Sequence, residues 1–162
     1  MTEGVAVGSF EDPRLEVAQK RLRESLDRAD VLEAIREIVT GLLGCEEIGL
    51  FAIERENREL LWSFGIDTER HGTLESFEES ALRRVMQGEL HVAEADHKEH
   101  AQQGNPPLQI FVPIRLHGRT VAVLVMLKLL PQKLGFDKAD INLAKLLSDE
   151  TGRALFERSA NA

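Results

Sequence analysis

The stretch from residue 108 to residue 129 constrains the fold of this chain more than any other. Apolar side chains alternate with other residues along 108–116, His117–Gly118 has the composition of a tight turn, and a long apolar run follows over 120–129. Alternation with a period of two is typical of a β-strand, and a two-residue turn containing glycine joins antiparallel strands. The sequence therefore predicts a β-hairpin, in which Pro113 marks an edge position or a bulge because proline cannot donate to the ladder.

A second hairpin is predicted in the first half of the chain. Both faces of residues 48–53 are apolar, which is typical of a central strand covered on both sides. A polar turn follows and leads into the predicted partner strand. Four larger side chains are expected to share one face of that strand: Leu60, Trp62, Phe64 and Ile66.

Helices are predicted at both ends of the chain. We expect the first over residues 13–27, with Asp12 as its N-terminal cap and a proline at its first position. Asp30 and Glu33 have the spacing of a capping box and predict the start of a second helix. A last amphipathic helix is expected over residues 137–158.

Between the hairpins, residues 67–107 carry a short helical pattern that ends at Gly88 and then a polar loop. Antiparallel hairpins with helices at both ends predict an α+β fold and argue against a parallel, Rossmann-type sheet. We expect a central antiparallel β-sheet of five to six strands, with the terminal helices on one face and segment 67–107 on the other. Residues 1–11 are expected to be a flexible tail, and residues 12–159 a single domain.

Charge and composition restrict the partners of this domain. The formal net charge is −8, and phosphate backbones are bound mainly by clustered lysine and arginine, so we expect no nucleic-acid partner. No run of about 18 apolar residues occurs, so no membrane span is predicted. The acidic N-terminus lacks an apolar signal core, and the single cysteine, Cys45, fits a reducing compartment; both features indicate a cytoplasmic protein.

Several stretches, in this order, resemble the GAF family of small-molecule-sensing domains. Residues 111–114, the His117–Gly118 turn and residues 121–124 are similar to the family's "V-P-L, turn, I-G-V-L" hairpin. Phe136 and Asp140, followed by leucines, resemble its closing helix. The resemblance covers nearly the whole folded chain and implies a free-standing single GAF domain with a PAS-related fold. The two amphipathic helices before the first strand favour GAF over PAS.

Some relatives in this family bind cyclic nucleotides, and their motif is only partly present. Lys128, Phe136 and Asp140 match it, whereas Leu127 and Ile141 replace its asparagine and glutamate. Two missing positions argue against cyclic-nucleotide binding, because function depends on the site and not on the fold.

Catalytic and cofactor-binding relatives depend on residues that this chain lacks. Bilin-binding relatives attach the chromophore through a cysteine in a different region from Cys45. Methionine sulfoxide reductases of this fold need several cysteines for thiol exchange, and only one is present. His91, His97 and His100 lie in or beside a polar loop, which offers a metal ion no rigid geometry. We therefore expect no enzyme, no cofactor and no metal site.

A ligand pocket is expected between one face of the sheet and segment 67–107, where GAF domains hold their ligands. We predict an apolar wall of Trp62, Phe64 and Phe111, with Arg115 as a polar anchor. The alternative is that these aromatic side chains simply complete the core.

Two functions are consistent with these features. The first is a small-molecule-sensing or regulatory domain of bacterial-type signal transduction that acts through a separate partner protein. The alternative is a ligand-free dimerisation or adaptor module that binds a signalling protein. An open pocket beside segment 67–107 favours the first, and a space filled by side chains favours the second.

A homodimer through the terminal helices fits both functions. Its predicted interface consists of Leu15, Leu22, Leu26, Leu147 and Leu155. On this interpretation, Leu22→Asp leaves the fold intact and shifts a dimer to a monomer.

Overall fold

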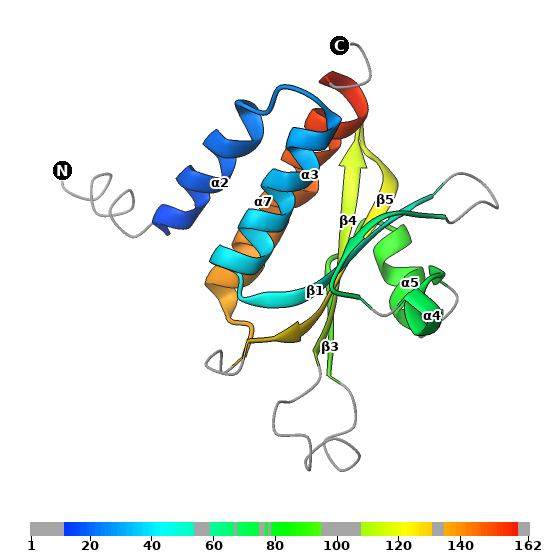
Figure 1. Ribbon diagram of the computed structural model, residues 1–162. Helices are drawn as coiled ribbons and strands as arrows, with labels where there is room; N and C mark the ends of the chain where they lie inside the picture. The colour runs from blue at the N-terminus through cyan, green and yellow to red at the C-terminus, as the bar shows by residue number, and fades with distance from the viewer. Residues whose placement is uncertain are drawn as a thin grey trace.

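A five-stranded sheet with the strand order β2-β1-β5-β4-β3 forms the centre of the computed structural model (Figure 1). Every pairing between neighbouring strands is antiparallel. The structure describes residues 12–53, 59–66, 68–74, 77, 79–94, 108–130 and 135–158. The elements are α2 (Pro13–Arg23), α3 (Arg28–Glu37), η1 (Ile38–Leu42), β1 (Cys45–Ala52), β2 (Leu60–Phe64), α4 (Thr68–His71), α5 (Glu79–Met86), β3 (His91–Glu94), β4 (Leu108–Leu116), β5 (Arg119–Leu129), α7 (Lys138–Arg153) and η4 (Ala154–Arg158).

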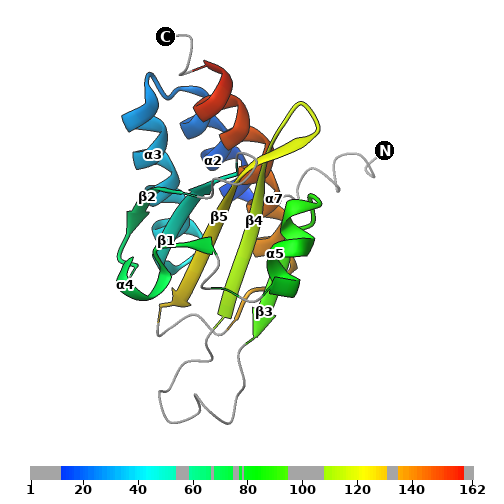
Figure 2. The ribbon, with the colours of Figure 1, turned by 90° about the vertical axis from the view of Figure 1, so that its right-hand side faces the viewer.

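The sheet separates two layers, as the two ribbon views show (Figures 1 and 2). Helices α3 and α7 cover one face, α2 packs on the outer side of these two helices, and the shorter α4 and α5 lie on the other face. Alternate residues of β5 join two different cores: Leu124 and Met126 pack with the three long helices, whereas Val123 and Val125 pack with α5. This arrangement confirms the predicted α+β fold with terminal helices on one face and the middle segment on the other.

The predicted β4–β5 hairpin is confirmed, including its turn and its proline. His117 and Gly118 both have positive φ, 53° and 79°, as a two-residue type I′ turn requires. Strand β3 pairs with β4 only as far as Phe111, so Pro113 lies where β4 is an edge strand. The register of the β4–β5 pairing shifts between Ile114 and Arg115, one step beyond the proline.

The first two helices differ from the prediction. Helix α2 ends at Arg23 rather than continuing to residue 27, and α3 begins directly after Asp27. The carboxylate of Asp27 accepts the backbone N–H of Asp30 at 2.8 Å, and that of Asp30 accepts the N–H of Leu26 at 2.9 Å. Asp27, not Asp30, is therefore the cap, because its side chain satisfies a helix N–H that has no partner within the helix.

The last helix begins as expected. Asp137 and Asp140 form a reciprocal capping box, with each carboxylate accepting the other residue's backbone N–H at 2.9 and 3.0 Å. The helix then continues through α7 into η4, which ends at Arg158. The predicted tail over residues 1–11 and the predicted domain end at residue 159 lie outside the described residues.

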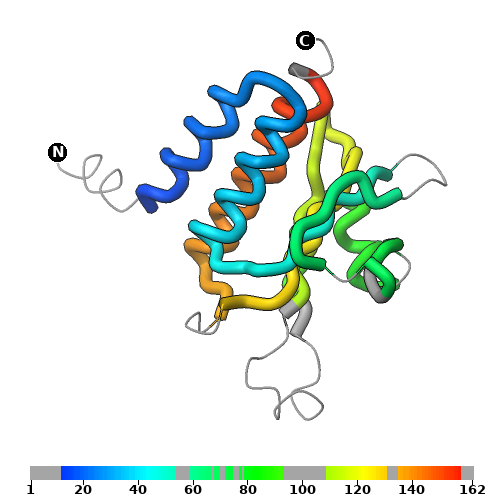
Figure 3. Tube along the Cα trace, in the orientation of Figure 1, coloured from blue at the N-terminus to red at the C-terminus, as the bar shows by residue number. Residues whose placement is uncertain are grey.

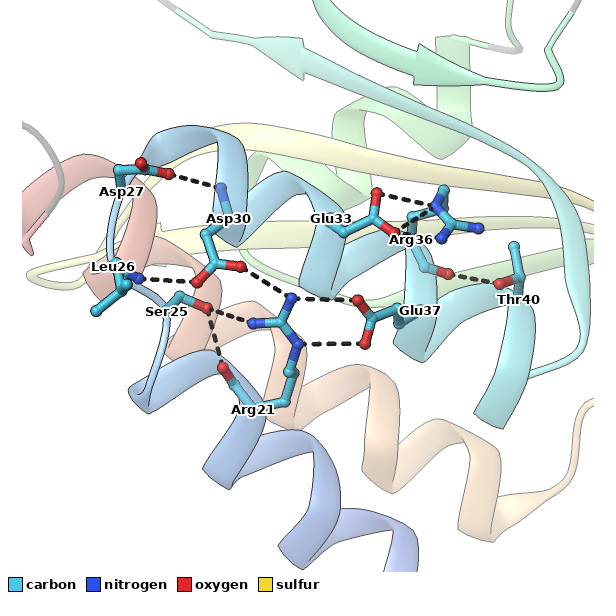
Figure 4. Close-up of polar contacts among 9 residues, drawn as sticks. All are labelled: Arg21, Ser25, Leu26, Asp27, Asp30, Glu33, Arg36, Glu37 and Thr40. Atoms are coloured by element: carbon cyan, nitrogen blue, oxygen red, sulfur yellow. Dashed lines mark hydrogen bonds and ion pairs between the residues drawn. The ribbon is translucent and has the colours of Figure 1, made fainter.

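The three long helices lie side by side (Figure 3). Charged side chains join them. Arg21 of α2 donates to Asp30 at 2.9 Å and to both oxygens of Glu37 at 3.1 and 3.2 Å, and thus connects α2 to α3 (Figure 4). Glu150 of α7 accepts from Arg23 of α2 at 3.1 Å.

Among the described residues, none of the helices has the length and apolar character needed to cross a membrane.

Candidate functional site

The four predicted ligand-binding residues do not meet on one face of the sheet. Trp62 lies opposite Leu50 in the β1–β2 ladder and packs against the core on the long-helix side. Phe64 is 41% exposed, and the Arg36 guanidinium of α3 lies 5.4 Å from its ring centroid. Phe111, in contrast, is fully buried in the core on the α5 side. The prediction that Trp62, Phe64 and Phe111 form one apolar wall is therefore wrong.

An irregularity in β2 contributes to this outcome. The register shifts so that Leu50 faces Trp62 while Phe51 faces Leu60, which inserts one extra residue into β2. A slip of one residue moves side chains to the opposite face of a sheet. Leu60 consequently packs with the α5-side core. Ile66, which lies beyond the end of β2 and follows Gly65 with its φ of +74°, packs there too, so the prediction that both share a face with Trp62 is wrong.

Three phenylalanines fill the described part of the space between the sheet and the α4–α5 segment. The ring of Phe77 lies edge-on to Phe111, with centroids 5.5 Å apart and an interplanar angle of 83°. It meets Phe51 in the same way at 6.2 Å and 82°. Phe77 is 6% exposed, and the other two rings are fully buried. On this face, the alternative interpretation of Phe111 as part of the core is the one that the structure supports.

Arg115, the fourth predicted residue, borders two adjoining surface clefts. We call these the edge cleft, of about 340 Å³, and the hairpin cleft, of about 400 Å³. Arg115 and Asp149 border both, so the two clefts meet at this pair. The edge cleft is lined by Gly88, Leu90, Pro113, Arg115, Lys145, Ser148 and Asp149, and the hairpin cleft by Arg115, Leu116, His117, Gly118, Asp149, Arg153 and Glu157.

Close contact between α7 and the edge of β4 shapes these clefts. The hydroxyl of Ser148, which is 8% exposed, donates to the carbonyl oxygen of Pro113. Gly152 lies so near the backbone of Arg115 that a Cβ atom there would collide with it. This end of β4 therefore offers little backbone for another strand, since Pro113 has no N–H and its carbonyl is already hydrogen-bonded.

The side chain of Arg115 connects the hairpin turn to the end of α5. Its Nη2 donates to the carbonyl oxygen of Gly118 at 2.7 Å. Its Nη1 lies so close to Gly88 that a Cβ atom at this position would collide with it. Gly88 has φ +94° and follows the last turn of α5, where the partial negative charge of the helix C-terminus favours a nearby guanidinium.

The remaining charges around the clefts are unevenly paired. His117 lies 2.8 Å from Glu157, and Arg153 lies 3.2 Å from Glu150. Within the part of the chain that the structure describes, neither Lys145 nor Asp149 forms an ion pair, and both are exposed. Neither residue was predicted from the sequence, because exposed charged positions on an amphipathic helix carry no distinguishing pattern.

Two residues of the partial cyclic-nucleotide motif have structural roles. Asp140 is 1% exposed, caps α7 and accepts from the Arg14 guanidinium at 2.8 Å. Lys128 has a positive φ of 55° and lies 3.4 Å from Glu46. Both side chains therefore already interact with other residues of the fold.

The histidines and the cysteine considered as possible metal or chromophore ligands do not form a common site among the described residues. His91 stacks on Phe111 with ring centroids 6.2 Å apart, whereas His97 and His100 lie outside the described residues. Among the residues that are described, no three His, Cys, Asp or Glu side chains gather where they could hold a metal ion. Cys45 is fully buried.

Most of the predicted dimer interface belongs to the chain's own core. Leu22 and Leu147 are fully buried, and Leu155 is 2% exposed, because these side chains belong to the core on the long-helix side of the sheet. Leu15 is half-buried against the same core, and Leu26 is 83% exposed. The prediction was wrong for the three buried leucines, which are not at the surface of the folded chain.

Comparisons with known proteins agree with this architecture. The family model of the GAF domain matches residues 25–155. The GAF domain of an Acinetobacter phosphoenolpyruvate-protein phosphotransferase is similar in structure, with a TM-score of 0.66, 17% identity and coverage of 93% of this chain and 95% of that one. The GAF domain of a putative sensor histidine kinase from Pseudomonas syringae pv. tomato has a TM-score of 0.62 and 14% identity, covering 91% and 86%.

An enzyme has the same fold. A type II free methionine-R-sulfoxide reductase from Thermoplasma acidophilum matches with a TM-score of 0.58 and 17% identity, and the match covers 89% of this chain and 95% of that one. At such identities the likeness shows the fold alone. No curated protein is similar enough in sequence to match.

Proposed function

Because this chain belongs to the GAF domain family, whose members are typically sensing or regulatory modules of signalling proteins, we propose that it is a regulatory domain that binds a small molecule at the Arg115 clefts. The observation that carries this proposal is the position of Arg115. Its guanidinium lies where the hairpin turn, the end of α5 and helix α7 meet. A ligand held there contacts three elements that are far apart in sequence.

Helix α7 supplies the route from ligand to output. Lys145, Asp149 and Arg153 project from it toward the clefts, while Leu147 on the same helix packs in the core with the long helices. A ligand that binds one position of α7 better than another shifts the population of the two positions. The signal then passes to a separate partner protein in the cytoplasm.

We further propose that the domain is not an enzyme. Thiol turnover of the reductase type needs a resolving thiol, and the chain has one cysteine, Cys45, which is fully buried. The cleft residues include no nucleophile next to a base: the hydroxyl of Ser148 donates to the Pro113 carbonyl instead.

The proposal is tested by native mass spectrometry of the protein purified from cells, alongside a denatured sample. We expect a non-covalent adduct that disappears on denaturation and is absent from Arg115→Gln. The matched control is Arg83→Gln, an exposed arginine on α5 that pairs with Glu79 at 3.4 Å. An adduct retained equally by both variants contradicts the Arg115 clefts as the binding site.

A ligand-free adaptor is the second candidate function, and the packing of Phe77 between Phe51 and Phe111 favours it. In this case the α5 face is a closed core, and the domain acts through protein contacts made as a homodimer. Leu26, at the corner between α2 and α3, is the most exposed member of the predicted interface. A clean ligand-free mass for a dimer supports this function over the first.

A further inference from the structure

Two side chains of opposite charge border both Arg115 clefts, and neither has an ion-pair partner among the described residues. Asp149 and Arg115 are the two charged residues shared by the edge cleft and the hairpin cleft. In the described part of the chain, Arg115 makes one side-chain hydrogen bond, to the neutral carbonyl of Gly118, and Asp149 pairs with no cation. They also do not pair with each other.

Arginines of the helical layer are, in contrast, paired. Arg14, Arg21 and Arg23 on α2 each lie within 3.1 Å of a carboxylate. The junction of the clefts therefore differs from the helical layer, because it presents one positive and one negative group to a shared space instead of joining them.

From this juxtaposition we propose that the Arg115 clefts bind a free α-amino acid as its zwitterion. The carboxylate of the ligand pairs with the Arg115 guanidinium, and its ammonium group pairs with the Asp149 carboxylate. This inference rests on the proposed function and names the chemical class of its ligand. Because its ammonium and carboxylate groups are both attached to the α-carbon, such a ligand can pair with both residues at once, which an ion of one sign cannot do.

The donors available at Arg115 fit this role. A guanidinium has five N–H donors in a fixed plane that matches a carboxylate, and Gly118 occupies only Nη2. Lys145, which is also without an ion pair in the described part of the chain, lines the edge cleft and adds a second cation there. The hydrogen bond to Gly118 and the contact with Gly88 already restrict the guanidinium, so less side-chain freedom is lost when the ligand binds.

The two clefts differ in what they offer the side chain of the amino acid. The edge cleft has an apolar wall of Leu90 and Pro113, whereas the hairpin cleft is lined by charged residues such as Arg153 and Glu157. We therefore place an apolar side chain in the edge cleft. Both clefts fall in the size range of small-molecule sites, about 300 to 1,000 Å³.

A ligand of purely negative charge fits less well. Asp149 lies at the centre of the joined clefts, Glu157 lines one of them, and the chain carries a net charge of −8. A dianion such as a phosphate ester can pair with Arg115 and Lys145 but meets the like charge of Asp149, whereas the ammonium group of a zwitterion pairs with Asp149.

The test is isothermal titration calorimetry of the full chain with L-leucine and two matched analogues. N-acetyl-L-leucine lacks the ammonium charge, and L-leucinamide lacks the carboxylate. We expect L-leucine to bind and each analogue to bind about tenfold more weakly or worse, because each leaves one charged group unpaired. Equal binding of leucine and its N-acetyl derivative overturns the inference.

Two variants test which residue pairs with each charged group of the ligand. Asp149→Asn, at an exposed position of α7, is expected to remove the preference for leucine over N-acetyl-leucine, and Arg115→Gln the preference over leucinamide. Arg83→Gln is the control and keeps both preferences. Arg115 also hydrogen-bonds to the hairpin turn, so its replacement can disturb the local structure. Asp149→Asn is therefore the variant that decides whether the clefts recognise the ammonium group.

The outcomes also separate this inference from the proposed function. If neither leucine nor any other amino acid in a panel binds, but a cellular ligand of another class is lost from Arg115→Gln, the proposed function holds and the zwitterion inference is overturned. If no small molecule of any class responds to Arg115→Gln, both are overturned.

Discussion

The Arg14 guanidinium donates to the Asp140 carboxylate at 2.8 Å and joins the first described helix to the last across 126 positions of sequence. Asp140 is 1% exposed, so its charge depends on this contact and on its capping hydrogen bonds. Arg14 also donates to Asp12 and, at 2.8 Å, to the carbonyl oxygen of Leu42. One side chain thus connects α2, α7 and the end of η1.

Arg14→Ala is therefore expected to lower the free energy of unfolding by about 2 kcal/mol, since it removes this charged hydrogen bond from a buried carboxylate. Urea denaturation at pH 7 measures the change. Arg83→Ala removes the exposed pair with Glu79 and serves as control, with little expected change. Equal losses in the two variants would show that the Arg14–Asp140 contact contributes no more than a surface pair.

Glu150 makes the stability of the helical layer dependent on pH. This carboxylate is 5% exposed. Burial raises its pKa, but hydrogen bonds from Arg23 and Gln19, together with the positive charges of Arg23 and Arg153, outweigh burial and hold the pKa below its usual value. A lowered folded-state pKa stabilises the fold above the unfolded value of about 4.3, and this stabilisation disappears as the pH falls through the folded value.

We expect Glu150→Gln to be less stable than the wild type at pH 7 and to lose less stability on acidification from about pH 5 to 3. Urea denaturation of both proteins over this range provides the comparison. Parallel pH profiles would mean that other carboxylates dominate the acid response. Asp12 is one such group, because its hydrogen bond with Arg14 lowers its pKa.

Phe77 is the residue whose removal should open the α5 face. Phe77→Ala deletes the ring between Phe51 and Phe111 and is expected to cost about 3 kcal/mol of unfolding free energy. The apolar space created is expected to bind indole, which should raise the melting temperature of the variant and not of the wild type. Phe64→Ala, at a ring that is 41% exposed, is the control and should bind no indole.

The dimer prediction changes with the burial of the leucines. Leu22→Asp places a charge in the core and is expected to cost more than about 4 kcal/mol, so it reports folding rather than association. Leu26→Asp, at a position 83% exposed, should leave the denaturation midpoint unchanged and convert a dimer to a monomer by light scattering. A mass unaffected by Leu26→Asp would remove this corner from the interface.

Two glycines test the contact that shapes the Arg115 clefts. Gly152→Ala drives a methyl group into the Arg115 backbone and is expected to cost about 2 kcal/mol. Gly41→Ala, where a Cβ atom meets nothing within 4 Å, should be neutral or stabilising by up to about 1 kcal/mol. Chemical denaturation distinguishes them, and equal effects would argue against close packing of α7 on β4.

The features that the sequence by itself determined are those set by neighbouring residues. Alternation and the His117–Gly118 turn produced the β4–β5 hairpin, and Asp137 capped the last helix as predicted, because these signals act within a few positions. Where two local signals competed, as with Asp27 and Asp30, the sequence alone did not decide which carboxylate would cap α3.

The tertiary structure decided which side chains meet. Trp62 and Phe111 lie on opposite faces because of the register between the strands, and Leu22 is buried because α7 packs against it. The junction of Arg115 and Asp149 depends on the close approach of α7 to an edge strand, at Gly152 and Ser148. Such contacts join residues far apart in sequence, and no local pattern encodes them, since periodicity specifies a face but not what covers it.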